Sequence, residues 1–284
     1  MENLAYYNGE IKPIEELKIP ILDRAVYFGD GVYEVVYSIN KKPFALKEHI
    51  NRFYSSLKLL KINFKMKEEE LKNLILTLVE KQKSKHQIIY WQASRGSGFR
   101  EHVFPLNQNA NLLITIREQK IKNMNKLKYN LITEKDTRFL HCNIKTINLI
   151  PAIMASEKAK QKNCDEAVLF REGEMVTECA HSNIAILKDG VFKTAPANNL
   201  ILPGVTRAHT IEIRKNLKIP VLEQPFSLKE LKNADEVIVL ASGCLAMGVN
   251  SINGQQVGQK DSKNLKAIQK AYQQKVIDCC NDFV

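Results

Sequence analysis

Lys145 is a candidate nucleophile because of the residues that surround it. It lies in the segment HCNIKTINLI (141–150), between Ile144 and Ile147, in a run that is mostly uncharged. Burial disfavours the charged form of an amine, so a half-buried lysine can supply the neutral amine that attacks a carbonyl. A lysine at a strand end that extends its ammonium group to water gives the same local pattern. This segment alone leaves both interpretations open.

Two further charged residues stand next to apolar positions. Glu178 follows a short apolar stretch in MVTECAHSNI (175–184), and taken alone it is a surface or turn carboxylate. Arg52 lies among apolar helix positions in HINRFYSSL (49–57). An arginine at the edge of a core pairs with an anion. That anion can be a ligand, or a carboxylate in a buried salt bridge.

The segment LPGVTRAHT (202–210) has the pattern of a glycine turn that leads into a helix. The helix is expected to begin near Val205 and Thr206, directly after Gly204. Free backbone amides at a helix start favour a phosphate group. An ordinary helix cap produces the same pattern, so the segment alone does not decide between them.

The periodicity of apolar residues predicts an α+β fold with mixed sheets, hairpins and packed helices. Hairpin turns are expected at Asn8-Gly9, after residue 39, at Asp189-Gly190 and at Asn253-Gly254. Strands are expected at 32–39, 87–94, 111–117, 127–132, 166–170 and 236–241. Helices are expected from 48 to about 60, at 67–83 and 151–162, from about 206, and at 262–279. We predict a small N-terminal α/β domain (1–118), a polar linker (119–126) and a larger C-terminal domain (127–284).

Composition is that of an ordinary globular protein, with 44% hydrophobic and 26% charged residues. No apolar run reaches about 18 residues and the N-terminus lacks a secretory signal pattern, so a cytoplasmic protein without membrane spans is expected. The six cysteines lack the spacing of a metal site and are expected to be reduced thiols. The net charge of +11 allows nucleic-acid binding, but the lysines are spread over the whole chain, which favours a solvated surface.

Taken together, the motifs resemble those of the fold-type IV pyridoxal-phosphate enzymes. This family includes D-amino acid aminotransferases, branched-chain aminotransferases and 4-amino-4-deoxychorismate lyases. The resemblance covers nearly the whole chain, and it depends on the order and spacing of motifs that are each modest. These motifs are DRAVYFGDGVYEV (23–35), EHINRFYSSL (48–57), RFLHCNIKTINL (138–149), DEAVL (165–169), VTECAHSN (176–183) and LPGVTR (202–207).

The resemblance implies a role for each candidate residue. Lys145 would hold pyridoxal 5'-phosphate (PLP) in Schiff-base linkage, and Glu178 would pair with the pyridine nitrogen, which keeps the ring an electron sink. The cofactor phosphate would be held by Arg52, the amides of Val205 and Thr206, and Ser242. The resemblance also implies a homodimer in which loops of one subunit complete the site of the other, and it implies no metal.

The loop SRGSGFREHVF (94–104) is most similar to the Arg-x-His pattern of D-amino acid aminotransferases. Arg100 and His102, with Tyr33, would bind the substrate α-carboxylate. The resemblance therefore favours a ping-pong PLP-dependent transaminase that moves the amino group of D-alanine or a similar D-amino acid to 2-oxoglutarate. A solvated charged loop is the alternative for Arg100 and His102.

Some positions depart from the aminotransferase pattern. LASGCLAMGV (240–249) has Gly243 and Cys244 where a run of hydroxyl residues is usual. Cys179 and His181 replace a glycine and serines, and a cysteine after the glutamate is more similar to the lyase subgroup. A 4-amino-4-deoxychorismate lyase and a branched-chain aminotransferase therefore stay open as alternatives, and outside enzymes a basic nucleic-acid-binding protein.

Overall fold

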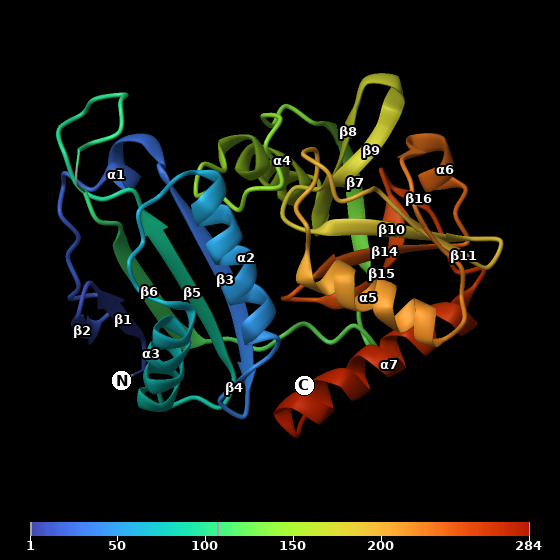
Figure 1. The fold of residues 1–284 in the computed structure, drawn as a ribbon. Helices are drawn as coiled ribbons and strands as arrows, with labels where there is room; N and C mark the ends of the chain where they lie inside the picture. The colour runs from blue at the N-terminus through green and yellow to red at the C-terminus, as the bar shows by residue number, and fades with distance from the viewer. Residues whose placement is uncertain (1, 107, 284) are drawn as a thin grey trace. The chain divides into compact units, whose positions relative to one another are not determined.

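The computed structural model describes residues 2–106 and 108–283, which form two compact units (Figure 1). Unit 1 contains Met1–Lys120, Ile144–Asn148 and Asp278–Val284, and unit 2 contains Ile121–Asn143 and Leu149–Ile277. The short segment that carries Lys145 therefore packs with unit 1, although it follows residue 126 in sequence. The division of the chain at a linker over 119–126 stays a prediction.

Unit 1 is built on a six-stranded sheet in the order β2-β1-β6-β5-β3-β4, and every neighbouring pair of strands is antiparallel. The strands are β1 (Leu4–Tyr7), β2 (Glu10–Pro13), β3 (Gly31–Ile39), β4 (Lys42–Pro43), β5 (Gln87–Ser94) and β6 (Asn111–Glu118). Along β3 the buried positions alternate with half-buried ones, as expected for a strand with one face on a core. That alternation decides which side chains of β3 can reach the helices.

Two helices cover one face of this sheet, and one short helix precedes β3 (Figure 1). They are α1 (Arg24–Phe28), α2 (Leu46–Leu59) and α3 (Glu68–Lys81). Ile50, Phe53 and Leu57 of α2 recur at helical spacing and join one core with Leu71 and Ile75 of α3. This packing fixes the rotation of α2 and so the direction in which its polar residues extend.

Unit 2 contains a mixed ten-stranded sheet in the order β12-β11-β10-β14-β15-β7-β8-β9-β13, with β16 paired to β15. The strands are β7 (Tyr129–Lys135), β8 (Glu166–Arg171), β9 (Met175–Cys179), β10 (Asn183–Lys188), β11 (Val191–Thr194), β12 (Val221–Glu223), β13 (Phe226–Ser227), β14 (Glu236–Ala241), β15 (Leu245–Ile252) and β16 (Gln255–Gln256). The pairs β7–β8, β7–β15 and β11–β12 are parallel, and the other pairs are antiparallel.

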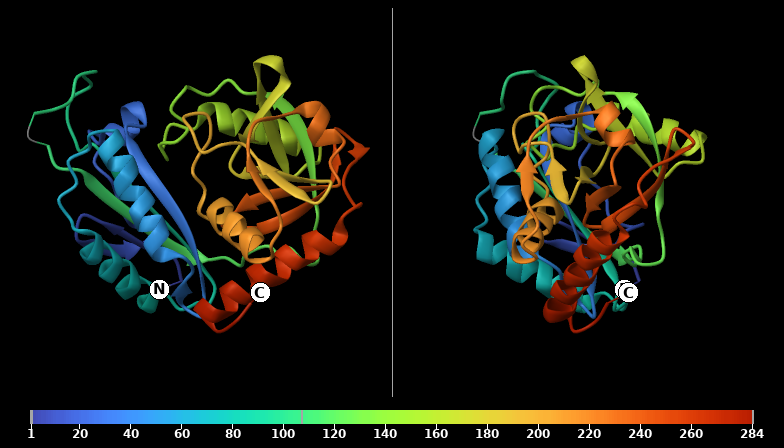
Figure 2. Two further views of the ribbon diagram at one scale, coloured as in Figure 1. Left: turned by 45° about the vertical axis from the view of Figure 1, so that its right-hand side comes forward. Right: turned by 90° about the vertical axis from the view of Figure 1, so that its right-hand side faces the viewer.

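Four α-helices of the described residues accompany this sheet: α4 (Ile150–Gln161), α5 (Val205–Asn216), α6 (Leu228–Lys232) and α7 (Ser262–Cys280). Small residues of α4, Ala155 and Ala159, pack against Ala167 and Leu169 of β8. Figure 2 shows α5 and α7 next to each other, and the rings of His209 and Tyr272 join them with centroids 6.0 Å apart. This packing fixes the position of α5 and so the position of the turn at Gly204 that precedes it.

The α+β class, the hairpins and the long helices agree with the sequence predictions. Turns at Asn8-Gly9, Asp189-Gly190 and Asn253-Gly254 each join antiparallel strands. The sequence did not predict α1, β9, β12, β13 and α6, which are all short and therefore give little periodicity. Among the described residues, no helix combines the length and the apolar composition that crossing a membrane requires.

Candidate active site

Lys145 lies in an extended segment that pairs with the beginning of β3. The amide of Tyr33 donates to the Lys145 carbonyl at 2.9 Å, and the amide of Ile147 donates to the Gly31 carbonyl at 3.1 Å. The Lys145 amide donates to Ser56 Oγ of α2 at 3.2 Å. Lys145 is half buried, as the sequence indicated, and both its strand and its helix neighbours hold its backbone.

Tyr33 is the aromatic residue in contact with Lys145. The Lys145 Nζ atom lies 4.2 Å from the centroid of the Tyr33 ring. The Tyr33 ring in turn stacks on Tyr90 of β5, with centroids 5.7 Å apart. The structure therefore brings two of the predicted site residues, Lys145 and Tyr33, into direct contact.

Arg52 extends from α2 to Glu34 of β3. Arg52 Nε donates to Glu34 Oε1 at 2.7 Å, and Arg52 Nη2 donates to Glu34 Oε2 at 2.8 Å. His49 Nδ1 lies 2.8 Å from the same Oε2 atom, and the Glu34 side chain is fully buried. The buried salt bridge that the sequence left open is therefore present.

Arg100 and His102 are exposed, and both lie against the ring of Phe28 rather than against Tyr33. The Arg100 guanidinium carbon is 5.3 Å from the Phe28 centroid, and the His102 and Phe28 ring centroids are 5.5 Å apart. Arg24 Nη1 donates to the Glu101 carbonyl at 2.7 Å, which ties down the backbone between them. Within residues 2–106 and 108–283, no hydrogen bond or ring contact joins Arg100 or His102 to Tyr33.

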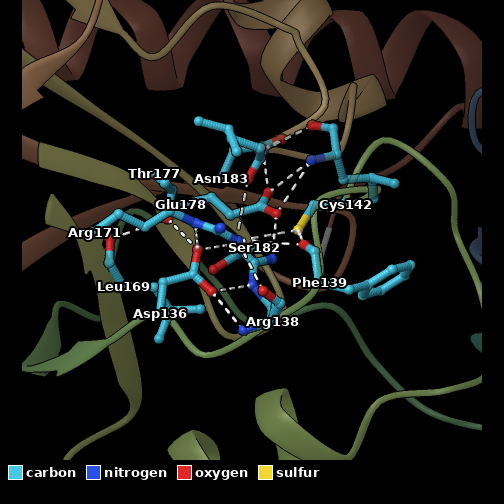
Figure 3. Close-up of polar contacts among 12 residues, drawn as sticks. Asp136, Arg138, Phe139, Cys142, Leu169, Arg171, Thr177, Glu178, Ser182 and Asn183 are labelled. Carbon is cyan, nitrogen blue, oxygen red and sulfur yellow. Dashed lines mark hydrogen bonds and ion pairs between the residues drawn. The ribbon is translucent and has the colours of Figure 1, made fainter.

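Glu178 is the centre of a buried polar network in unit 2 (Figure 3). It accepts hydrogen bonds from Arg138 Nη1 at 2.5 Å, from Asn183 Nδ2 at 2.8 Å and from the Leu202 amide at 3.1 Å. Arg138 is held in turn by Asp136, which accepts from its Nε and Nη2 atoms at 3.0 Å. Burial raises the pKa of Glu178 to about 7, although Arg138 and the Leu202 amide act in the opposite direction.

Asn183 connects Glu178 with the start of α5. Its Nδ2 atom also donates to the Leu202 carbonyl at 2.9 Å. A Cβ atom at Gly204 would overlap with Asn183 Oδ1, so only glycine fits between the turn and this amide. Among the residues that the structure describes, no side chain caps α5, which begins at Val205 directly after Gly204. The amides of Val205 and Thr206 therefore stand at a helix start that attracts anions.

The remaining predicted residues are also in unit 2. Ser242 lies in the tight turn between β14 and β15. Cys179, at the end of β9, is buried, whereas His181 is exposed and places Nδ1 2.6 Å from Glu166 Oε2. Ser182 Oγ donates to the same Glu166 oxygen at 2.9 Å. His181 is thus paired with Glu166, a second buried carboxylate, which lies at the start of β8.

The predicted residues therefore fall into two groups. Unit 1 brings Lys145, Tyr33 and Arg52 to the junction of β3 and α2, and it holds Arg100 and His102 on the loop after β5. Unit 2 brings Glu178 and the start of α5 together through Asn183. That all of these residues act on one cofactor stays a prediction.

Sequence reasoning missed Glu34, Arg138 and Asn183. Glu34 had a signal, because it occupies the buried register of β3 between Val32 and Val36. Arg138 stands two positions after Asp136 at the end of a strand, which is a compact charge pair. Asn183 had no local signal, since its importance follows from contacts with residues far away in sequence.

The family model for amino-transferase class IV matches residues 31–252, a range that includes Tyr33, Arg52, Lys145, Glu178 and Ser242. The chain belongs to the class IV aminotransferases. Enzymes of this family use PLP, so this class IV aminotransferase is a PLP-dependent transaminase.

Similar proteins agree with this placement. A D-alanine aminotransferase of Listeria monocytogenes is 36% identical over 283 residues, covering 98% of this chain and 97% of that protein. A D-alanine aminotransferase of Staphylococcus epidermidis is 35% identical over 254 residues, covering 89% and 90%. Among solved structures, the T.th. branched-chain amino acid aminotransferase with pyridoxamine 5'-phosphate has a TM-score of 0.88 at 27% identity, covering 96% of this chain and 93% of that one.

The residues of this class IV aminotransferase fit PLP. The amides at the start of α5, directly after Gly204, have no side-chain cap among the described residues, which suits a phosphate. Glu178 is buried with a raised pKa, so a cationic ring nitrogen would stabilise its charged form. Lys145 presents an amine beside Tyr33. When bound, PLP supplies an aldehyde and an electron-withdrawing ring.

Arg138→Met should destabilise the cofactor-free protein in a pH-dependent way. Removing one partner of a buried ion pair costs about 3–5 kcal/mol, because it leaves an uncompensated charge. Without Arg138 the pKa of Glu178 rises above its present value of about 7, which already exceeds the usual value of a free carboxyl. A carboxyl whose pKa is raised by folding lowers the free energy of unfolding as the pH rises towards that pKa. The free energy of unfolding of Arg138→Met should therefore fall further below that of the native protein between pH 6 and pH 9.

Thermal unfolding at both pH values measures this deficit. Arg171→Met is the matched control, because Arg171 Nε donates to Asp136 at 3.0 Å and, within the described part of the chain, makes no bond to Glu178. Its deficit should stay constant over the same range. If the loss of stability changed with pH equally in the two variants, Arg138 would not govern the charge of Glu178.

Proposed function

We propose that this enzyme transfers the amino group of D-alanine, or a similar D-amino acid, to 2-oxoglutarate. The observation that carries this proposal is the similarity, over nearly the whole chain, to proteins named D-alanine aminotransferase. The loop with Arg100 and His102 supports it, because a guanidinium and an imidazole suit a carboxylate. The branched-chain transaminase is the second candidate, since the T.th. branched-chain enzyme has a similar fold.

In this proposal each group of residues has its own task. Lys145 holds the cofactor covalently and, once released, moves the proton of the substrate α-carbon. Glu178 faces the ring nitrogen, and Arg52, Ser242 and the amides of Val205 and Thr206 bind the phosphate. Tyr33, Arg100 and His102 bind the substrate carboxylate and so orient the α-carbon.

A panel of D- and L-amino acids with 2-oxoglutarate tests the substrate. We expect turnover with D-alanine, formation of pyruvate and D-glutamate, and parallel lines in double-reciprocal plots, because the two substrates react in separate halves. Turnover with L-valine or L-leucine and formation of L-glutamate would identify a branched-chain transaminase instead. Release of pyruvate from 4-amino-4-deoxychorismate without an amino acceptor would identify the lyase.

We also infer a cytoplasmic homodimer whose partners are small amino acids and 2-oxo acids, and which does not bind nucleic acid. The exposure of Arg100 and His102 supports this inference, because in the described residues of unit 1 they extend outwards without contacting Tyr33 of the same chain. The same loop exposes Phe99 at 80% and Val103 at 68%, apolar surface that a second copy would cover. Arg100 and His102 would then serve the site of the partner subunit.

Mixing two impaired variants tests this arrangement. Arg100→Ala should raise KM about 10–100-fold by removing a charge-assisted bond, and Lys145→Ala should be inactive. In a hybrid dimer one site would regain both native residues if Arg100 acts across subunits. Mixed and refolded subunits should therefore recover activity at low substrate concentration. Recovery no greater than the sum of the two variants would place Arg100 in its own subunit's site.

A further inference from the structure

We propose that Glu34 is a positioning residue that fixes the guanidinium of Arg52 for the cofactor phosphate. This proposal deepens the function proposed above and rests on the assignment of Arg52 as a phosphate ligand. Glu34 itself would not contact the cofactor. It would act by holding Arg52 in one orientation.

The contact between Glu34 and Arg52 is a two-point one. Both Glu34 oxygens accept from Arg52, at 2.7 Å from Nε and 2.8 Å from Nη2. Two parallel bonds between a planar carboxylate and a planar guanidinium fix distance and rotation together, which a single bond does not. The long Arg52 side chain is thereby restricted to one rotamer, so less entropy is lost when it binds an anion.

Stability alone does not explain a carboxylate at this position. Glu34 is fully buried, between Val32 and Val36 on the face of β3 that α2 covers, and opposite Trp91 of β5. Apolar residues of similar volume usually replace a buried ion pair without loss of stability. A charged pair among apolar neighbours therefore indicates a role other than stability. Holding the Arg52 side chain in one orientation is such a role.

The pair lies next to the segment of Lys145. Ser56, which accepts from the Lys145 amide, follows Arg52 by four positions and so shares its face of α2. Tyr33, the neighbour of Glu34, donates to the Lys145 carbonyl. Burial, and after it the charges of Arg52 and Lys145, lower the pKa of His49, which contacts Glu34. Arg52 Nη2 lies 3.4 Å from Nδ1 of this buried imidazole.

The partners of Glu34 favour its charged form. Burial acts to raise its pKa, but Arg52 and His49 together bring it down to about 2. Arg52 therefore has a permanent anionic partner, which permits a guanidinium to stay in a largely buried position before the phosphate arrives. Glu34→Gln would keep the shape of the side chain and remove that anion.

Comparison of PLP with pyridoxal, which lacks the phosphate, separates positioning from folding. The chain has a single tryptophan, Trp91, and quenching of its fluorescence by the bound ring reports the Kd of either compound. We expect Glu34→Gln to raise the Kd for PLP about 10–100-fold and to leave the Kd for pyridoxal within about twofold of the native value. Glu48→Gln, which changes an exposed carboxylate on α2, the helix that carries Arg52, is the control and should change neither Kd.

Arg52→Ala and the double variant complete the test. If Glu34 acts through Arg52, Arg52→Ala should cause the same phosphate-specific loss, and the double variant should lose no more than Arg52→Ala. Should Glu34→Gln fail to fold, Glu34→Asp keeps the buried charge but shortens the side chain. It should then show a smaller, still phosphate-specific, loss.

The outcomes distinguish this proposal from the assignment on which it rests. A native Kd for PLP in Glu34→Gln, or equal losses for PLP and pyridoxal, would overturn the positioning role. A native Kd for PLP in Arg52→Ala would overturn the phosphate assignment of Arg52 together with it. If the native protein bound neither compound, the proposed enzyme function would fail as well.

Discussion

Lys145→Ala should abolish turnover and the covalent attachment of the cofactor. In the proposed function the variant lacks both the amine that would hold the aldehyde and the base that would move the α-proton, so kcat should fall by at least about 10⁴-fold. Reduction of the native enzyme with borohydride should fix the cofactor to the peptide that contains Lys145, as seen by mass spectrometry. The variant should give no such peptide.

Lys160→Ala, on the exposed face of α4, is the control and should keep native labelling and turnover. Added methylamine should restore part of the activity of Lys145→Ala, because a free amine can replace the missing base. Labelling of a different lysine in the native enzyme would remove Lys145 from the mechanism. It would leave the membership in the family untouched.

Glu178→Gln should lower kcat by about 10²–10³-fold while the cofactor stays bound through Lys145. A neutral amide cannot keep the ring nitrogen protonated, so the ring withdraws electrons less strongly. KM should change little, because the proposed ligands of the substrate carboxylate are Tyr33, Arg100 and His102 and not Glu178. Steady-state kinetics with D-alanine and 2-oxoglutarate measure both constants.

A cofactor analogue with carbon in place of the ring nitrogen isolates this effect. With 1-deazapyridoxal phosphate the native enzyme and Glu178→Gln should have the same low kcat, since there is no nitrogen for Glu178 to face. Glu172→Gln, an exposed carboxylate on the same hairpin, should behave as native with both cofactors. A persistent difference between native and Glu178→Gln on the deaza compound would mean that Glu178 acts in another way.

Local sequence patterns predicted most of the fold. The strand over 87–94 agrees with β5 to the residue, because its apolar residues alternate and polar segments bound it. The helix expected at 67–83 was found at Glu68–Lys81, since its apolar spacing is regular. Short elements such as α6 escaped notice, because five residues carry little periodicity.

The candidate site was only partly predictable, because most of its contacts join segments that are distant in sequence. Lys145 and Glu178 stood out through their neighbours and through the family resemblance. The partners that orient Arg52 and Glu178 did not, since Glu34 and Arg138 meet them only through sheet pairing and helix packing. The resemblance supplied roles, and the structure supplies the side chains that hold those residues in place.

The interleaving of the two units has a consequence for how the protein can be dissected. Neither unit is one continuous stretch of chain, because Ile144–Asn148 joins unit 1 from the middle of the segments that form unit 2. A fragment that ended at residue 120 would lose the Lys145 strand that pairs with Gly31 and Tyr33, and the complementary fragment would carry that strand without its partner. The Lys145 segment therefore keeps its native pairing only where both stretches of the chain are present.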